Sequence, residues 1–391
     1  MSGAGSDRAA IARAEVLKVE LSLLEPFVTS FGPTASRHTV VVRLTDADSA
    51  VGWGEAAPLD HPFYLPDTVA SAFSTIVDYA LPLCLRAGAG SGLEAARAMA
   101  PIRGNTFARA GVEAAFWALE GERTGRSLRD LVGGTHDRVP VGESIGMKRS
   151  IDETLEEVAL RLGQGYRRIK LKIAPGWDLD VIRATREAFG DVVLLVDANG
   201  GYAPEHAEHL AELDAFGLLC IEQPLSSDDL LGHAELQRRL QTPICLDESL
   251  RSAQDVRRAL RMDACRNVNL KPGRVGGITE SLAVHDLCVE AGVPLWCGGM
   301  LESGIGRAPN LALCSLPGFT QPADMSPASV LFTEDLVEPT YEVEADGTIP
   351  VPTSAGLGFA VDEERLRART VRRIELDVDG DVCSTFERSI Q

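Results

Sequence analysis

The sequence predicts an α/β protein in which an α+β unit is followed by a barrel of parallel strands. In the first part, alternating strands are followed by Ala-rich helical segments. From Val139 onward, short apolar strands alternate with amphipathic helices, which is typical of a parallel sheet. Eight such units in roughly 190 residues favour a closed barrel over an open sheet. Charged residues also recur at the ends of successive strands.

The chain has 391 residues, which is long enough for two domains or for a barrel with an appendage. Hydrophobic residues make up 45% of it, enough for a large core. It has no run of about 18 apolar residues, so we expect no transmembrane helix. Residues 1–13 are small and polar without an apolar stretch, so we expect a flexible extension and no signal peptide.

The charge balance is acidic, with 38 Lys and Arg against 57 Asp and Glu, a net charge of −19. This argues against nucleic-acid partners and anionic membranes. We expect a small-molecule carboxylate substrate, captured by local cations or a metal, and a homo-oligomer. The eight cysteines form no C-x-x-C pair and most lie in apolar runs, which favours small, buried, free thiols in a reducing, cytoplasmic compartment.

Residues 14–135 are predicted to form an α+β domain. The strands expected from alternation are Val16–Leu21, Thr39–Leu44 and Val51–Glu55. The polar segment Thr29–Thr34 is predicted to be a loop. The pattern from Thr68 to Val132 is helical, and Gly133–Gly134 ends it.

Residues 136–328 are predicted to form the barrel, and residues 329–391 a C-terminal segment. The expected barrel strands are Val139–Met147, Arg167–Ile173, Val192–Asp197, Leu218–Glu222, Ile244–Asp247, Asn267–Lys271 and Leu295–Gly298. An eighth short strand is expected near Phe319. The alternating piece Arg372–Val378 is expected to pack back on the first domain.

Five of these strands end on a charged residue: Lys172, Asp197, Glu222, Asp247 and Lys271. The successive separations are 25, 25, 25 and 24 residues, one strand–helix unit each. In a parallel barrel the carboxyl ends of all strands lie on one face, and that face carries the chemistry. The spacing therefore predicts that these five side chains form one ring, rather than being unrelated charged strand ends.

Three adjacent carboxylates repel one another unless a cation lies between them. An all-oxygen ligand set without His or Cys suits a hard ion, Mg²⁺ first and Mn²⁺ second. Asp197, Glu222 and Asp247 are therefore the predicted metal ligands.

The lysines lie at opposite ends of the series and are expected to face each other across the metal. Lys170 shares a strand face with Lys172. Alone, this pair also fits a solvated sheet edge. Beside the ring, a second ammonium and a metal would lower the pKa of Lys172 enough for it to act as a base. The predicted chemistry is abstraction of a proton α to a carboxylate, with the metal stabilising the enediolate.

At this point the sequence resembles the o-succinylbenzoate synthase / N-acylamino acid (N-succinylamino acid) racemase family, in the muconate-lactonizing subgroup of the enolase superfamily. The motifs that carry the resemblance are Lys170–Lys172, Val196–Asn199, Ile221–Pro224, Leu246–Ser249, Asn269–Gly277, Thr29–Gly32, Gly52–Glu55 and Trp296–Gly304.

The resemblance implies a (β/α)7β TIM-like barrel, capped by an α+β domain built from the N-terminal region and the C-terminal tail. It implies Mg²⁺ on the three carboxylates, Lys172 as acid/base on one substrate face, Lys271 on the other, and Lys170 near the substrate carboxylate. The remaining site residues that it implies are Glu248 and Asn199 behind the ligands, Phe31 and Tyr64 closing the pocket from the cap, and Ser144, Gly298, Met300 and Leu301 lining it.

Two reactions of that family use this machinery. One is the dehydration of 2-succinyl-6-hydroxy-2,4-cyclohexadiene-1-carboxylate on the menaquinone route, for which one base suffices. The other is racemization of N-succinylamino acids, which needs a base on each face. Arg274 matches an arginine of racemase-capable members and would tune Lys271 by like charge. Its alternative is a solvated loop arginine.

Other functions fit the sequence less well. Dipeptide epimerases carry Asp-x-Asp near the last strand, where this chain has only Asp324. A muconate cycloisomerase is the runner-up, and a non-catalytic metal-binding scaffold is the alternative from another class. The glycine-rich run Gly273–Gly277 lacks phosphate-loop spacing and is predicted to be a turn. His206 and His209 are predicted to be solvated.

Overall fold

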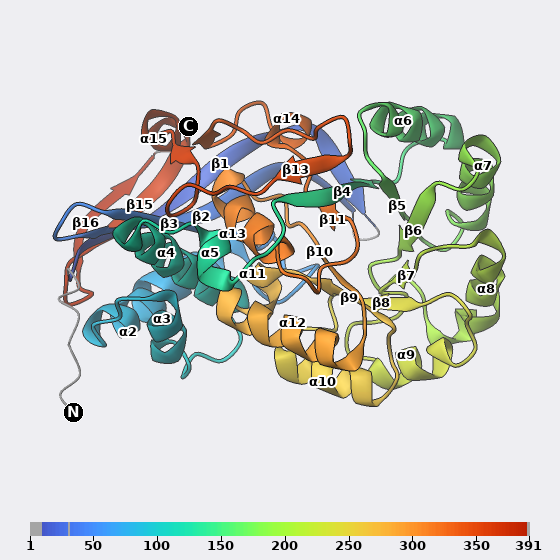
Figure 1. Ribbon diagram of the computed structural model, residues 1–391, viewed down its shortest axis with the longest axis horizontal. Helices are drawn as coiled ribbons and strands as arrows, with labels where there is room; N and C mark the ends of the chain where they lie inside the picture. The colour runs from blue at the N-terminus through green and yellow to red at the C-terminus, as the bar shows by residue number, and fades with distance from the viewer. Residues whose placement is uncertain (1–9, 30–31, 389–391) are drawn as a thin grey trace.

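A computed structural model describes residues 10–29 and 32–388. It has two parts, an antiparallel cap and a barrel of parallel strands (Figure 1). The predicted loop residue Phe31 and most of the predicted N-terminal extension lie outside the described residues. The end of that extension, Ile11–Arg13, differs from the prediction, because it already belongs to the first strand.

The cap is built around a five-stranded sheet whose strands come from both ends of the chain. Its order is β16 (Val382–Glu387), β15 (Thr370–Leu376), β1 (Ile11–Thr29), β2 (Gly32–Asp46) and β3 (Val51–Ala56). β15 pairs antiparallel with β1, with Val16 opposite Ile374. The alternating C-terminal piece therefore returns to the cap.

Helices cover one side of this sheet. They are α1 (Val69–Thr75), a π-helical turn (Ile76–Ala80), α2 (Leu81–Arg86), α3 (Gly92–Ala98) and α4 (Thr106–Thr124). The short α5 (Leu128–Val132) follows α4, and its buried Leu128 and Val132 belong to the core of the barrel. Small residues such as Gly111 and Ala115 let α4 lie directly against β3. The stretch Val69–Arg86 is long and apolar enough to cross a membrane by length and composition alone. Its residues Phe73, Ile76 and Leu81 are buried in the core of the cap, as expected for a helix of a protein core.

The barrel strands follow one another around the ring in chain order. They are β4 (Arg138–Ile145), β5 (Arg168–Lys172), β6 (Val193–Asp197), β7 (Ile221–Glu222), β8 (Ile244–Leu246), β9 (Asn267–Leu270), β10 (Leu295–Cys297) and β11 (Ala323–Asp324). β11 pairs in parallel with β4. The predicted fold, a TIM-like barrel with a cap from both termini, is confirmed.

The eighth strand differs from its prediction. It forms at Ala323–Asp324 rather than at Phe319, which makes only an isolated parallel bridge to Leu295. Pro322 precedes the strand and has no N–H to donate to a neighbour. The barrel is therefore nearly closed, with its weakest seam between β10 and β11.

Helices form the outer wall of the barrel (Figure 1). They are α6 (Ile151–Gly163), α7 (Leu179–Phe189), α8 (Ala207–Ala211), α9 (Leu230–Gln237), α10 (Ala253–Arg261), α12 (Ile278–Ala291) and α13 (Gly304–Cys314). The short α11 (Pro272–Val275) lies at the carboxyl end of β9, against α4 of the cap. Several begin on a side-chain cap, such as Ser150 for α6 and Ser252 for α10. The predicted turn Gly273–Gly277 is confirmed only at its end: Gly276 and Gly277 have positive φ angles and form a turn before α12, whereas Gly273–Val275 belong to α11.

The C-terminal segment crosses from the barrel to the cap. It contains α14 (Ala328–Leu331), β12 (Val337–Glu338), β13 (Thr348–Pro350), β14 (Ala360–Val361) and α15 (Glu363–Arg369). β13 pairs antiparallel with β4.

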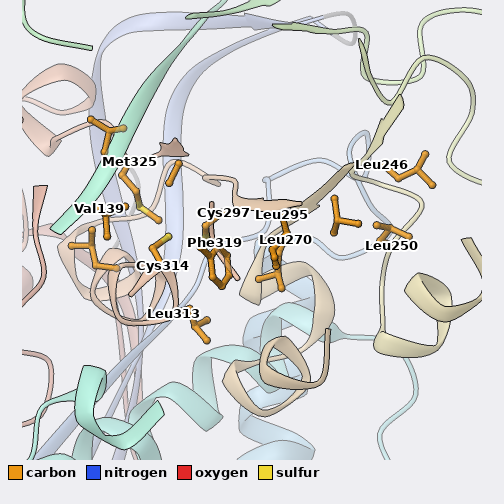
Figure 2. Close-up of a cluster of buried hydrophobic side chains, with 14 of the residues drawn as sticks. Val139, Leu246, Leu250, Leu270, Leu295, Cys297, Leu313, Cys314, Phe319 and Met325 are labelled. Carbon is orange, nitrogen blue, oxygen red and sulfur yellow. The ribbon is translucent and has the colours of Figure 1, made fainter. Parts of the chain in front are cut away.

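A continuous apolar core joins the strands to the surrounding helices. Figure 2 shows part of it, where Leu270, Leu295 and Phe319 lie together. Seven cysteines are buried as expected, and all eight are free thiols. Cys383 is exposed and departs from that prediction.

Glu55 on β3 connects the cap to the barrel. Its carboxylate accepts hydrogen bonds from the backbone N–H of Gly306 (2.9 Å) and from the hydroxyls of Ser303 (2.6 Å) and Thr39 (2.7 Å). Ser303 and Gly306 lie at the start of α13, where backbone N–H groups lack partners within the helix. A side chain of the capping domain therefore accepts hydrogen bonds from the start of a barrel helix, which fixes the two parts of the protein relative to each other.

We expect a Glu55→Gln variant to change how stability depends on pH. Burial raises the pKa of Glu55 from 4.5 to about 7, so between these values the folded protein holds a proton that the unfolded chain releases. The contribution of the Glu55 proton to the free energy of unfolding is complete below pH 4.5. It is lost as the pH rises to 7, by about 3 kcal/mol in all. Urea unfolding of wild type, Glu55→Gln and the exposed control Glu364→Gln measures it. Parallel curves for wild type and Glu55→Gln would contradict this.

Candidate active site

The fold brings the five predicted charged residues together at the carboxyl ends of β5 to β9. Lys172, Asp197 and Glu222 are the last residues of β5, β6 and β7 and lie side by side in the strand register. Asp247 directly follows β8, and Lys271 directly follows β9. All five side chains are buried. Their ion pairs form a network in two parts, one around Asp197 and Glu222 and the other around Asp247.

The carboxylates and ammonium groups of this network are in direct contact. Lys172 Nζ lies 2.5 Å from Asp197 Oδ2, and Lys271 Nζ lies 2.8 Å from Asp247 Oδ2. Glu222 accepts from Asn269 Nδ2 at 2.7 Å. Burial and the neighbouring Asp197 raise the pKa of Glu222. Burial alone would raise the pKa of Asp197, but Lys172 and Lys170 outweigh burial and lower it.

The three carboxylates fit a hard divalent cation in donor type and in their order along neighbouring strand ends. They are oxygen donors on consecutive strand ends, 0–1% exposed. Among the described residues, no three acidic, His or Cys side chains already converge on one point as ligands. Asp197, Glu222 and Asp247 are instead directed at lysine and arginine groups. A buried acidic set of this kind suits Mg²⁺ or Mn²⁺.

Lys170 is enclosed by acidic side chains. Its Nζ lies 2.6 Å from Asp324 Oδ2, 3.1 Å from Glu222 Oε2 and 3.7 Å from Asp197 Oδ2. Burial opposes the charge, but these carboxylates outweigh it and raise the pKa of Lys170. Lys170 is therefore a cation, as expected, but its charge is compensated, which weakens its predicted repulsion of Lys172.

Lys271 is contacted by Tyr64 from the cap. Tyr64 Oη lies 3.0 Å from Lys271 Nζ and donates to Asp247 Oδ1 at 2.7 Å. The ammonium also lies 4.6 Å from the centre of the Tyr64 ring. Burial lowers the pKa of Lys271, but Tyr64 and the nearby carboxylates Glu222 and Glu248 outweigh this and raise it.

Arg274 is fully buried, so the alternative of a solvated loop arginine is wrong. It donates to the Leu250 carbonyl at 2.7 Å and also to Asp247 and the Asn269 carbonyl. The raised pKa of Lys271 means that the expected lowering by Arg274 does not dominate. Its main partner is the carboxylate of Asp247.

Asn199 links Lys172 to Glu248. Its Oδ1 accepts from Lys172 Nζ at 2.8 Å, and its Nδ2 donates to Glu248 Oε1 at 2.9 Å. Burial, followed by the charge of Asp197, raises the pKa of Glu248 to about 7. Asn199 therefore orients the predicted base directly.

The predicted lining residues do not share one position. Gly298 lies against Lys271, where a Cβ would overlap the lysine chain. Ser144 and Leu301 line a cavity of about 520 Å³ between β4, α6 and the end of β1. The Met300 side chain belongs to the apolar core of the cap, so its lining role is not seen. Phe31 lies outside the described residues.

Sequence reasoning missed three side chains around Lys170. They are Asp324, Arg168 and Trp296. The strand period of two places Arg168 on the same face as Lys170, which was a usable signal. His209 also differs from its prediction, because it is 2.8 Å from buried Asp178 rather than simply solvated.

The barrel, its cap and the buried acid–lysine ring define an enolase-superfamily protein. Residues 153–365 match the family model "Enolase C-terminal domain-like", and residues 11–133 match "Mandelate racemase / muconate lactonizing enzyme, N-terminal domain". More particularly, the chain belongs to the o-succinylbenzoate synthase / N-succinylamino acid racemase family, as its relatives show.

The relatives come from several bacteria. The chain is 44% identical to an o-succinylbenzoate synthase of Geobacillus kaustophilus, over 90% of this chain and 94% of that one. It is 44% identical to an N-succinylamino acid racemase of Amycolatopsis sp., over 92% and 97%. A solved enolase-superfamily structure from Listeria innocua has a TM-score of 0.91 at 37% identity, over 95% of this chain and all of that one. The chain is therefore an enzyme of this superfamily, related to both lyases and isomerases.

Proposed function

We propose that the protein abstracts the proton α to a substrate carboxylate in a Mg²⁺-dependent reaction, as an o-succinylbenzoate synthase, an N-succinylamino acid racemase, or both. The observation that carries this proposal is the buried ring in which Lys172 and Lys271 stand at opposite ends of three carboxylates. The two relatives at 44% identity, one of each activity, support it.

In this proposal Asp197, Glu222 and Asp247 hold the metal. The bound cation would stabilise the negative charge that develops on the substrate carboxylate as the proton leaves. Lys172 takes the α-proton on one face, oriented by its hydrogen bond to Asn199. Lys271, positioned by Tyr64 and Asp247, faces the other side. Lys170 remains a cation near the substrate carboxylate.

The two reactions use Lys271 differently. In racemization it returns or removes a proton on the second face, so it must exchange protons. In dehydration it remains an ammonium that stabilises charge, because one base suffices. The raised pKa of Lys271 suits the second role before substrate binds.

The runner-up functions have less support. Asp324 already pairs with Lys170 and Arg168, so it is not available for the substrate ammonium of a dipeptide epimerase. A muconate lactonizing enzyme from Pseudomonas fluorescens is similar in structure, with a TM-score of 0.88, but only 28% identical. A non-catalytic scaffold would not need both lysines. A cytoplasmic, homo-oligomeric enzyme of menaquinone biosynthesis remains our proposal.

Two incubations with Mg²⁺ test the proposed function. Conversion of the cyclohexadiene substrate is followed by absorbance, and conversion of N-succinyl-L-phenylalanine by optical rotation. We expect turnover in at least one. Failure of both would contradict the proposal, and racemization without dehydration would indicate a dedicated racemase.

A further inference from the structure

We propose that Asp324 is a positioning residue for this reaction and acts by holding the Lys170 ammonium in place. The inference rests on the proposed function and deepens it. Asp324 Oδ2 lies 2.6 Å from Lys170 Nζ, and Asp324 Oδ1 lies 2.7 Å from Arg168 Nη1. One carboxylate thus connects two cations of β5 to the last barrel strand.

The arrangement depends on a row of three residues in register. Gly142 of β4 is the strand partner of Arg168 on one side and of Asp324 on the other. A Cβ on Gly142 would overlap the Arg168 guanidinium. The glycine therefore leaves the space through which a β5 side chain reaches β11, two strands away.

Other side chains hold the two ends of this row. The Trp296 ring lies 4.9 Å from the Arg168 guanidinium and 4.7 Å from the Lys170 ammonium, measured to its centre. Cations at this distance are attracted to an aromatic face. Arg307 donates to the Asp324 carbonyl at 2.6 Å, which anchors the backbone of the short strand. The Lys170 ammonium is thus held by the Trp296 ring on one side and by the Asp324 carboxylate on the other.

Asp324 differs from the other acidic partners of Lys170. Glu222 and Asp197 are proposed metal ligands, so a bound cation would draw their oxygens toward itself. Asp324 is not among the proposed metal ligands, so its carboxylate would stay paired with the Lys170 ammonium. We infer that Asp324 maintains the direction of the ammonium toward the substrate carboxylate when the metal is bound.

A double-mutant cycle tests this role. We expect Asp324→Asn to lower kcat/KM about 10-fold to 100-fold, mainly through KM, since misplacing a group that orients substrate has such effects. Lys170→Met should lower it at least as much. If Asp324 acts through Lys170, the double variant should be no worse than Lys170→Met alone. Asp324→Glu should recover part of the loss.

The control is Asp335→Asn, a buried aspartate that accepts the Gly304 N–H at 2.9 Å, away from the lysines. The effects of Asp335→Asn and Lys170→Met on kcat/KM should be independent and therefore multiply in the double variant. Binding of o-succinylbenzoate, measured by calorimetry on the same proteins, gives a readout independent of turnover. If the protein is active and the effects of Asp324→Asn and Lys170→Met on kcat/KM multiply, the role of Asp324 is overturned but the proposed function is not. A wild type that neither turns over nor binds these compounds would overturn the proposed function as well.

Discussion

A Lys271→Ala variant is expected to lose racemization by about three orders of magnitude while part of its dehydration activity remains. Racemization requires proton transfer on both faces of the α-carbon, and Lys271 is the buried amine at the far end of the ring from Lys172. Dehydration requires one base and is weakened only by loss of the second cation. A Lys172→Ala variant should lose both activities, since it removes the shared base.

These variants are compared by chiral analysis of N-succinylphenylalanine and by absorbance of the dehydration product. The matched control is Lys18→Ala, a half-buried lysine of the cap strand β1 that lies outside the ring. Its activities should equal those of wild type. Equal α-deuterium exchange from both enantiomers in Lys271→Ala would refute the two-base model.

Removal of the metal, or of its central ligand, should have the second large effect. Glu222 stands between Asp197 and Asp247 in the ring, so Glu222→Gln deletes the middle negative charge. We expect both activities to fall about 100-fold or more at a Mg²⁺ concentration that saturates wild type, and chelation of wild type by EDTA to abolish them until Mg²⁺ is restored.

Thermal unfolding with and without MgCl₂ gives a second readout for this prediction. A ligand that binds only the folded state at about 100 times its Kd adds about 2.7 kcal/mol to the unfolding free energy. Wild type should show this gain and Glu222→Gln should not. Glu113→Gln, a buried glutamate that accepts from Trp117 and Thr279, should retain it. An equal gain in Glu222→Gln would remove Glu222 from the ligand set.

The periodic part of the site was predictable from the sequence. Strands of a parallel barrel end on one face, so a charged residue at each strand end defines a ring without any tertiary information. Lys172, Asp197 and Glu222 lie in neighbouring register for this reason. Motifs such as Ile221–Pro224 then identified the family.

Contacts between distant segments were not predictable in the same way. Asp324 sits on a two-residue strand whose pattern is too short to define a face. Tyr64 reaches Lys271 from a cap loop, and Glu55 completes α13 from the other domain. The sequence does not distinguish a buried Arg274 from a solvated one, because its burial depends on packing against Asp247. Sequence periodicity gives the direction of side chains within an element, but not which loop closes over it.

Exchange of the α-proton in D₂O tests most directly whether two buried lysines act on opposite faces of a substrate carboxylate. Wild-type protein with Mg²⁺ is incubated separately with the L and D enantiomers of N-succinylphenylalanine, and loss of the α-proton signal is followed by NMR. We predict exchange from both enantiomers, which stops when Mg²⁺ is chelated. No exchange from either enantiomer, together with no dehydration, would contradict the proposed chemistry.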